Sequence, residues 1–449
     1  MVNELRDLMQ QLVASPPEGD SDLGAVLAGG RSRVRRRRRG LATVVAAAAT
    51  VAAVAGTALV AGGGDDADDQ VANRTVPRPD GPVLHLGDAT PAAEGTDYDV
   101  LASYTNEDLD AANGQYYDGV TDDGLILFRD GPHGVDNSFR LALLDPATGD
   151  KDWLPAHDLG SQPQPVALGR DRLVLVTWVT DQGEGMRAVA FDRGTRRWSD
   201  LTWPDLPESA NAWSAKLGPD GRLYVGVPAT VGSPPPGGWP TGKDGEADDS
   251  AAEGDTYDLW SVSLDDTADV RDERLRVGSF AFADDSLVWT ARTNGTNDRI
   301  HVRDLATGEE QDFDPRSGER CNVLSFGVVD DKVVLSEYCG DYDDGRDDRV
   351  QVLTTAGEPV TTIQGNGLDG YVTGGLVKVT AYAGRTAGSY VYEPDSGRFV
   401  RVSDGVSSYA LGGGPLPDGY LMWETPVGKA SDPQEPIPGA TQWLVRWRS

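Results

Sequence analysis

Residues 122–128 have the sequence Asp122-Asp123-Gly124-Leu125-Ile126-Leu127-Phe128, in which a tight acidic turn leads directly into an apolar run. Aspartate and glycine favour tight turns, whereas branched and aromatic residues favour β-strands. A turn followed at once by four apolar residues is typical of the second strand of a β-hairpin. This stretch therefore predicts that two antiparallel strands meet at residues 122–124.

The same turn-and-strand unit occurs seven times along the chain. Its apolar runs begin at Leu125, Leu173, Leu223, Leu287, Val333, Leu376 and Tyr420. The successive steps are 48, 50, 64, 46, 43 and 44 residues, close to the ~40–50-residue period of β-propeller blades. The longest step contains the acidic, proline-rich insertion at residues 231–258, which we expect to form a flap beside its blade.

A second turn lies further along within most units, often with the pattern Asp-x-x-Thr-Gly. It occurs at residues 145–149, 192–194, 304–308, 356–357 and 395–397. Because each of these turns lies between two β-runs, every unit should contain four antiparallel strands, A to D. The sequence thus predicts an all-β, seven-bladed β-propeller at residues 82–449, preceded by a single N-terminal transmembrane helix.

The repeating unit resembles the blades of the TolB-like, WD40-like and pyrroloquinoline-quinone-dehydrogenase-like β-propellers, which carry the same hairpin between their outer strands. The resemblance covers residues 82–449 as an architecture. The Gly-His and Trp-Asp pairs of WD40 blades and the paired glycines of kelch blades are missing, so no functional residues are transferred from these families. The outline of an arginine cluster at residues 35–39, a single uncharged segment at residues 40–64 and a propeller after it also resembles exported proteins of GC-rich actinobacteria.

The last unit predicts how the ring closes. Strand C of this unit lies at residues 443–447, and the chain ends before a fourth strand. An unpaired edge of this kind needs a partner. We expect residues 82–86, the first β-run after the linker, to supply the missing strand.

An uncharged segment at residues 40–64 is long enough to cross a membrane, since ~20 apolar residues span the hydrocarbon layer as a helix. Five arginines directly before it are expected to fix its orientation by the positive-inside rule: Arg35, Arg36, Arg37, Arg38 and Arg39. Residues 1–39 should therefore be cytoplasmic, residues 65–81 a flexible linker, and residues 82–449 extracytoplasmic, in a single-pass protein of the cell membrane. A cleaved signal peptide is the alternative, although the preceding region and the apolar run are both longer than a signal peptide usually has.

The cytoplasmic segment has one further feature. Apolar residues recur at helical spacing within residues 3–14, which predicts a short amphipathic helix. This helix could lie on the membrane surface or dock onto a cytoplasmic partner.

Charge excludes one class of partner. The formal net charge is −32, and residues 1–40 hold eight arginines against five acids, so the rest of the chain carries −35. A strongly acidic exterior is unsuited to nucleic acid, which needs a positive surface.

The two cysteines, Cys321 and Cys339, lie nine residues on either side of position 330, at the centre of a predicted hairpin. Antiparallel strands folded about that centre would place them opposite each other. In an oxidising compartment this arrangement predicts a cross-strand disulfide.

Catalytic motifs are absent from the sequence. The four histidines form no recognisable metal or protease motif, and there is no GxSxG. The sequence offers one candidate cation site, at Asp341, Asp343 and Asp344, because alternating carboxylates followed by glycine are typical of the start of a calcium loop. This segment lacks the acid at the fifth position and the closing glutamate of the EF-hand loop. We therefore expect no cofactor, with calcium as the one alternative.

We therefore interpret the chain as a membrane-anchored binding or sensor protein. The long B–C loops should lie on one rim of the ring, where an extracytoplasmic protein, a cell-wall component or a small molecule would bind. One alternative is a propeller-type hydrolase or lactonase whose carboxylates converge only in the folded protein. A second alternative is an anti-sigma-like membrane regulator that acts through residues 3–14.

Overall fold

The computed structural model describes residues 81–109, 114–131, 139–179, 185–233, 254–293, 299–317, 321–339, 347–365, 367–382, 384–406, 414–428 and 439–448. The predicted cytoplasmic helix, the arginine cluster, the segment at residues 40–64 and nearly all of the linker lie outside these residues. Within the described ranges, no helix is long and apolar enough to cross a membrane.

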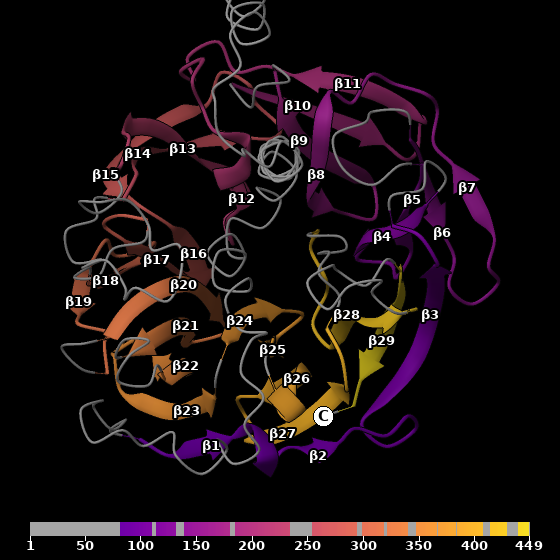
Figure 1. Ribbon diagram of the computed structural model, residues 1–449. Coiled ribbons are helices and arrows are strands. Elements are labelled where there is room, and N and C mark those ends of the chain that lie inside the picture. The colour runs from indigo at the N-terminus through magenta and orange to yellow at the C-terminus, as the bar shows by residue number, and fades with distance from the viewer. Residues whose placement is uncertain are drawn as a thin grey trace, which may run out of the picture. The chain divides into compact units, whose positions relative to one another are not determined.

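Seven antiparallel sheets follow one another around a ring, so the predicted seven-bladed β-propeller is confirmed (Figure 1). Blade 1 consists of β4 (Gln115–Val120), β5 (Ile126–Asp130), β6 (Arg140–Leu144) and β7 (Lys151–Trp153). Blade 2 consists of β8 (Ser161–Leu168), β9 (Arg172–Trp178), β10 (Met186–Asp192) and β11 (Arg197–Leu201). Blade 3 consists of β12 (Lys216–Leu217), β13 (Arg222–Thr230), β14 (Thr256–Ser263) and β15 (Val270–Val277). Blade 4 consists of β16 (Phe280–Ala283), β17 (Ser286–Thr290), β18 (Ile300–Asp304) and β19 (Glu310–Phe313).

The remaining blades include strands from the N-terminal part of the described chain. Blade 5 consists of β20 (Cys321–Val329), β21 (Lys332–Cys339), β22 (Asp347–Thr354) and β23 (Pro359–Gly365), with β1 (Val83–His85) at its outer edge. Blade 6 consists of β24 (Leu368–Thr373), β25 (Leu376–Ala381), β26 (Gly388–Glu393) and β27 (Arg398–Ser403), with β2 (Thr90–Pro91) at its edge. Blade 7 contains β28 (Tyr420–Val427), β29 (Gly439–Trp447) and β3 (Tyr98–Asn106). Three short 3-10 helices are also described: η3 (Leu86–Asp88), η4 (Ala212–Ser214) and η6 (Gly384–Thr386).

The turns that predicted the blades lie where the sequence placed them. Asp284 and Asp330 connect strands A and B in blades 4 and 5, and both adopt left-handed backbone conformations, with φ of 42° and 49°. Aspartate tolerates this region better than most residues because its short side chain can bond locally. In the second type of turn, the Asp145 side chain accepts a 2.8 Å hydrogen bond from the amide of Ala147. Local turn chemistry therefore fixes the hairpins.

The ring closes through a different strand from the one predicted. Strand β3 pairs antiparallel with β29 over nearly its whole length, from Tyr98 opposite Trp447 to Asn106 opposite Ala440. The prediction that residues 82–86 close blade 7 is wrong. Only three of those residues form a strand, β1, whereas β3 and β29 are nine residues each and match in length.

Residues 83–91 instead run along the outside of two other blades. Strand β1 pairs parallel with β23 of blade 5, and β2 pairs parallel with β27 of blade 6. We call residues 83–91 the outer belt. It covers the outer edges of blades 5 and 6 before the chain reaches blade 7 as β3 (Figure 1).

Apolar side chains between the blades form the core. Between blades 2 and 3, for example, Val174 and Val176 of β9 pack in one buried cluster with Leu223 and Val225 of β13. Strands buried on both faces bring apolar residues to each neighbouring blade, and this burial is the main stabilising contribution.

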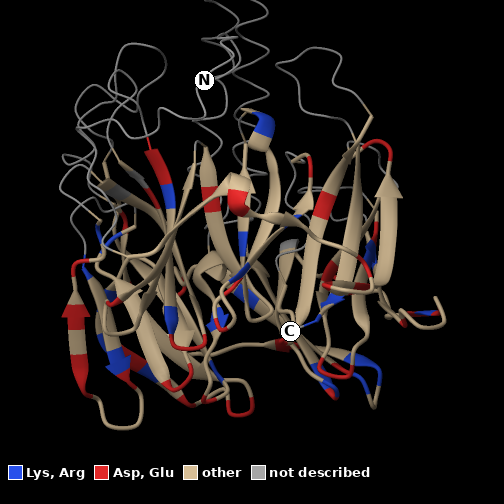
Figure 2. Cartoon of the chain, turned by 90° about the horizontal axis from the view of Figure 1, so that it is seen from below, with Lys and Arg blue, Asp and Glu red and all other residues tan. Residues whose placement is uncertain are grey.

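The two faces of the ring differ. In all seven blades, the ends of strands B and C that flank the B–C connection pair with each other, as Cys339 pairs with Asp347 and Trp178 with Met186. We call the face where these ends lie the loop face, and the face with the A–B and C–D turns the turn face. In the edge-on view, many acidic and basic residues lie on the turns of the turn face (Figure 2).

Candidate functional site

Charged side chains are buried in blades 5 and 6. Glu337, Asp347, Asp348 and Arg349 are only 1–3% exposed, and Asp369 is 7% exposed. Such residues are almost never fully buried unless they are paired. A group of them at one place on the ring therefore identifies a candidate site.

The strands explain how these residues come together. Asp347, Asp348 and Arg349 are the first three residues of β22, where the chain returns from the loop face, and Glu337 lies near the same end of β21. Asp369 is the second residue of β24, strand A of blade 6, which lies at the inner side of that blade (Figure 1). The site is therefore in the half of blades 5 and 6 nearest the loop face.

Asp369 joins blade 6 to blade 5. Its Oδ1 atom accepts hydrogen bonds from the hydroxyls of Ser336, at 3.0 Å, and Ser325, at 3.4 Å. Ser336 Oγ also accepts a 2.7 Å bond from the amide of Gly370. Burial raises the pKa of Asp369 to about 6, although these hydrogen bonds oppose the shift.

Gly370 makes this close approach possible. A Cβ atom at this position would lie 2.6 Å from a side-chain carbon of Val350 in blade 5, which is too close for any other residue without movement. Glycine is therefore required where β24 packs against blade 5.

Lys378 lies on the same hairpin as Asp369. In the β24–β25 pair, Lys378 is opposite Tyr371 and Thr380 is opposite Asp369, so Lys378 and Asp369 are diagonal neighbours on one face, roughly 7–8 Å apart at Cα. The amine of Lys378 donates a 3.3 Å hydrogen bond to the Met422 carbonyl of blade 7 and lies 5.0 Å from the centre of the Tyr371 ring.

Burial lowers the pKa of the Lys378 amine to about 8, and the charge of Glu424 in blade 7 opposes this shift. Burial also raises the pKa of Tyr371 well above its ordinary value. Burial thus raises the pKa of the Asp369 carboxyl and lowers that of the Lys378 amine, so both values move toward pH 7. Groups whose pKa values are shifted by burial in this way occur often at functional sites. The polar contacts of Asp369 are to blade 5, and that of the Lys378 amine is to blade 7.

A second group of buried polar side chains lies in blade 5 and bonds within itself. Arg349 Nε donates to Asp347 Oδ2 at 2.7 Å, and Gln364 Nε2 donates to the same oxygen at 2.8 Å, while Asp347 Oδ1 is buried without a hydrogen-bond partner. Arg349 Nη1 also donates to Ser317 Oγ at 2.5 Å, and Ser317 Oγ donates to Glu337 Oε2 at 2.7 Å. Burial raises the pKa of Asp347 and of Glu337, and the charge of Arg349 opposes both shifts.

The predicted disulfide is present and lies beside this group of polar side chains. Cys321 and Cys339 are paired across β20 and β21 and are joined by a 2.04 Å S–S bond. Both are buried, and Arg349 Nη1 lies 3.9 Å from Cys321 Sγ. The disulfide therefore holds the loop-face end of blade 5, where Glu337 and Arg349 are located.

The other residues singled out in the sequence do not form this site. Asp341, Asp343 and Asp344, the candidate calcium ligands, and Arg35 to Arg39 lie outside the described residues. Among the residues that are described, the one group of three potential metal ligands is Cys321, Glu337 and Cys339. Because both cysteines are in the disulfide, they offer no thiolate to a metal.

The described histidines have packing contacts instead. His157 stacks on Trp198 with ring centres 5.6 Å apart, and His301 stacks on Trp289 at 5.1 Å. His85 ends the outer-belt strand β1, on the far side of blade 5 from its inner strand.

The sequence analysis missed Asp369 and Lys378. One signal was available for the lysine, because the chain has 34 arginines but only six lysines. Lysine loses its proton readily when buried, whereas arginine does not, so a lysine within an apolar strand of an arginine-rich chain is informative. Nothing in the sequence around Asp369 indicated that Ser336 would bond it.

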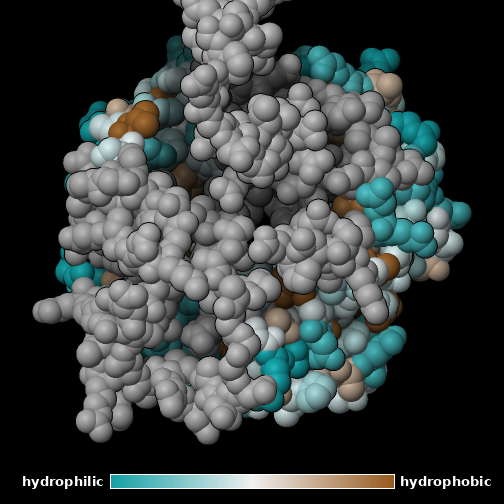
Figure 3. Space-filling model, in the orientation of Figure 1, coloured by the Kyte–Doolittle hydropathy of each residue, from teal (hydrophilic) through white to brown (hydrophobic). Residues whose placement is uncertain are grey.

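Large apolar side chains are scattered over the described surface. Those that are exposed lie in blades 1, 2, 3 and 6: Trp153, Val179, Leu217, Val231 and Tyr382. The described outer rim is largely hydrophilic in the space-filling view (Figure 3). The described surface thus has no extended apolar patch of the kind that marks an obligate protein interface.

Comparison with known proteins assigns the chain to no family. No family model matches the chain, and no curated protein does. Among solved structures, the chain is similar to an oligogalacturonate lyase in complex with manganese, with a TM-score of 0.46, 13% identity, and 80% of this chain and 99% of that chain covered. It is also similar to an acylaminoacyl peptidase of Pyrococcus horikoshii, with a TM-score of 0.46, 11% identity, and 76% of this chain and 54% of that chain covered. A puromycin-hydrolyzing peptidase of Mycobacterium tuberculosis gives a TM-score of 0.44, with 14% identity and 75% and 53% of the two chains covered.

The described part of the chain is a seven-bladed β-propeller with a group of buried titratable residues in blades 5 and 6. The chain spans about half the length of the two peptidases that it resembles.

Proposed function

We propose that the chain is a membrane-anchored, extracytoplasmic β-propeller that catalyses acid–base chemistry, of the hydrolase or lyase class, on a small ligand at the inner wall of blades 5 to 7. The observation that carries the proposal is the Asp369–Lys378 pair on one hairpin face. With pKa values of about 6 and about 8, Asp369 is ionised and Lys378 is protonated at pH 7. One group can accept a proton and the other can donate one.

Their roles follow from these charges. In hydrolysis of an ester or lactone, the Asp369 carboxylate would accept the proton of the attacking water, and the Lys378 ammonium would supply a proton to the leaving oxygen. General acid–base catalysis of this kind contributes typically ~10²–10⁴-fold to a rate.

The test is turnover by the purified full-length chain in detergent on panels of ester, lactone and glycoside substrates. Activity should follow a bell-shaped pH profile with limbs near pH 6 and pH 8, because one group must be ionised and the other protonated. Asp369→Asn and Lys378→Met should each remove most of the activity. Lys216→Met is the matched control, because the Lys216 amine also donates to a carbonyl, that of Phe280, but lies in blade 3.

A second candidate function is that of a binding or sensor protein. It is favoured by the strand pairing, which places the B–C ends of all seven blades on the loop face. An extracytoplasmic protein, a cell-wall component or a small molecule would bind there. Specific binding by a chain that shows no turnover on any panel, and that is unaffected by Asp369→Asn, would favour this candidate over the enzyme.

The location of the protein is part of the proposal. Residues 40–64 would anchor the chain, with residues 1–39 in the cytoplasm and the propeller outside. A reporter that works only in the cytoplasm should give no signal when fused after Ser449. A cytoplasmic partner of residues 3–14, as an anti-sigma-like regulator would need, can be tested by pull-down from cell extracts with residues 1–40.

A further inference from the structure

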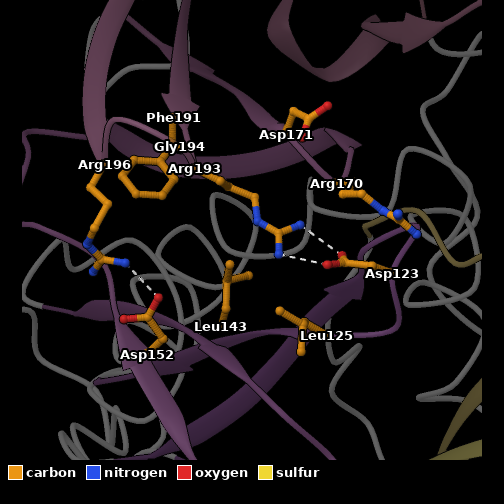
Figure 4. Close-up of a pocket in the computed structure, with 10 residues that line it drawn as sticks. All are labelled: Asp123, Leu125, Leu143, Asp152, Arg170, Asp171, Phe191, Arg193, Gly194 and Arg196. Atoms are coloured by element: carbon orange, nitrogen blue, oxygen red, sulfur yellow. Dashed lines mark hydrogen bonds and ion pairs between the residues drawn. The ribbon is translucent and has the colours of Figure 1, made fainter.

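A recess of about 320 Å³ lies between blades 1 and 2 on the turn face, away from the Asp369–Lys378 pair. Pockets that hold small ligands run from about 300 to 1,000 Å³, so this recess is at the lower end of that range. Its apolar floor consists of Leu125 and Leu143 from blade 1 and Phe191 from blade 2 (Figure 4). Leu143 and Phe191 are buried, and they belong to the core cluster between these two blades.

Two ion pairs between the blades border the floor. Arg193 donates to both carboxylate oxygens of Asp123, each at 2.8 Å, and Arg196 donates to Asp152 at 2.6 Å. Figure 4 shows the floor between these two pairs. Because each arginine is matched by an aspartate, the borders contribute no net charge.

Two charged residues at the rim are not matched in this way. Arg170 and Asp171, neighbours in the A–B turn of blade 2, line the recess and are exposed. Among the interactions of the described residues, neither side chain forms an ion pair. In Figure 4 their charged ends point away from the floor. Since both are exposed, either side chain can turn toward a ligand at the rim.

The recess thus combines a small apolar floor with one exposed cation and one exposed anion, neither of which forms an ion pair with a described residue. The charge of Asp171 also acts on nearby Arg193. The complementary ligand has a small apolar body, a carboxylate and an ammonium group. We propose that this recess binds a free apolar α-amino acid of the leucine or phenylalanine type. Its side chain would cover the floor, its carboxylate would contact Arg170, and its ammonium group would contact Asp171.

This ligand uses each feature of the recess. Charge-assisted hydrogen bonds such as those to Arg170 and Asp171 are the stronger kind, which compensates for the small apolar area of the floor. An uncharged apolar molecule would leave both rim charges without partners, and a simple carboxylate would leave Asp171 without one. The Arg193–Asp123 pair spans the two blades beside the floor.

The test is isothermal titration of the full-length chain in detergent with L-phenylalanine and L-leucine, up to about 10 mM, which covers the ~1 mM affinity expected for a ligand stabilised by about 4 kcal/mol. N-acetyl-L-phenylalanine lacks the ammonium group, and L-phenylalaninamide lacks the carboxylate. Each should bind about tenfold more weakly than L-phenylalanine, since each lacks one of the two charge-assisted contacts. A Phe-Phe dipeptide, in which the two charges are on different residues, should also bind more weakly.

Two variants test the rim charges. Arg170→Gln should weaken binding of L-phenylalanine about tenfold and should have little effect on the amide, and Asp171→Asn should do the reverse with the N-acetyl compound. Arg276→Gln is the control, because Arg276 is an exposed arginine of blade 3. Melting temperatures confirm that each variant is folded. The proposal is overturned if the wild-type chain gives no saturable heat, if both analogues bind as tightly as the amino acid, or if neither rim variant differs from the control.

Discussion

Arg193 of blade 2 and Asp123 of blade 1 face each other across the boundary between two blades, joined by two hydrogen bonds of 2.8 Å. Arg193 also donates to the Gly169 carbonyl, and Asp123 also accepts from the hydroxyl of Thr121. The side chains are only 15% and 24% exposed. This pair therefore links blade 1 to blade 2 with a fixed geometry.

A double-mutant cycle with Arg193→Gln and Asp123→Asn should give a coupling energy of about 0.5–1 kcal/mol, at the upper end for surface pairs because the geometry is bidentate. Hydrogen bonding to Arg193 lowers the pKa of Asp123 to about 2. The coupling should therefore be fully present above pH 4 and should be lost as pH falls through about 2. Urea unfolding of the four proteins at several pH values measures it, and a coupling energy unchanged at the lowest pH would contradict this account.

Asp369→Asn should stabilise the protein at neutral pH. Burial raises the pKa of Asp369 from 3.8 to about 6 in the folded state, so the folded chain retains this proton at a pH where the unfolded chain has lost it. Stability contributed by this group is therefore highest below pH 4 and falls as pH rises to about 6. A pKa difference of this size corresponds to roughly 3 kcal/mol, so the variant should be about 1–3 kcal/mol more stable at pH 8 and nearly equal to wild type at pH 4. Thermal unfolding from pH 4 to 8 measures the effect.

The control for that experiment is Asp205→Asn, because Asp205 is exposed in the loop after β11. It should leave the pH dependence of stability unchanged. An Asp369→Asn variant whose stability falls with pH as steeply as that of wild type would show that another group causes the dependence.

Proline substitutions in β1 and β3 should have very different effects. Val100→Pro removes a ladder position in β3, the strand that pairs with β29 and closes the ring, and should destabilise the protein by about 3 kcal/mol or more. Leu84→Pro changes only β1, which lies at the edge of a blade that already has four strands. This substitution should lower the free energy of unfolding by about 1 kcal/mol or less. Melting temperatures of the two variants compare them directly. Equal losses would mean that the outer belt contributes as much to closure as β3 does.

Changing both cysteines to alanine should lower stability by about 1–3 kcal/mol and leave the propeller folded. The disulfide closes a short loop, for which chain-entropy estimates give ~3 kcal/mol, but β20 and β21 are already held by their ladder. Wild-type protein reduced under native conditions should show the same loss. Mass spectrometry of the purified protein should find Cys321 and Cys339 without free thiols, and a free thiol at either position would contradict the prediction.

The sequence predicted the blades because their signals are local. Gly124, Asp284 and Asp330 each mark a turn directly before an apolar strand, and the structure places a turn at each of them. The disulfide was equally accessible, since Cys321 and Cys339 are related by the symmetry of a single hairpin. These features depend on residues that are close together in the chain.

The closing strand and the candidate site could not be predicted in this way. Strand β3 and its partner β29 are more than 300 residues apart, and both β1 and β3 are plausible partners for an unpaired edge. Asp369 is bonded by Ser336, which lies in another blade, and its burial depends on the close packing allowed by Gly370. Such contacts depend on how blades pack, and no short sequence pattern encodes that packing.

The pairing of β3 with β29 determines when the ring can close during synthesis. Its partner β29 is the last described strand, so β3 must wait until more than 300 further residues have been synthesised. At ~5–20 residues per second this delay is on the order of half a minute. During that time an edge strand with Tyr98, Val100 and Ala102 on it has no partner, and an unpaired strand edge is a template for aggregation. A ribosome that stops before residue 439 thus releases a chain that lacks the strand needed to close the ring.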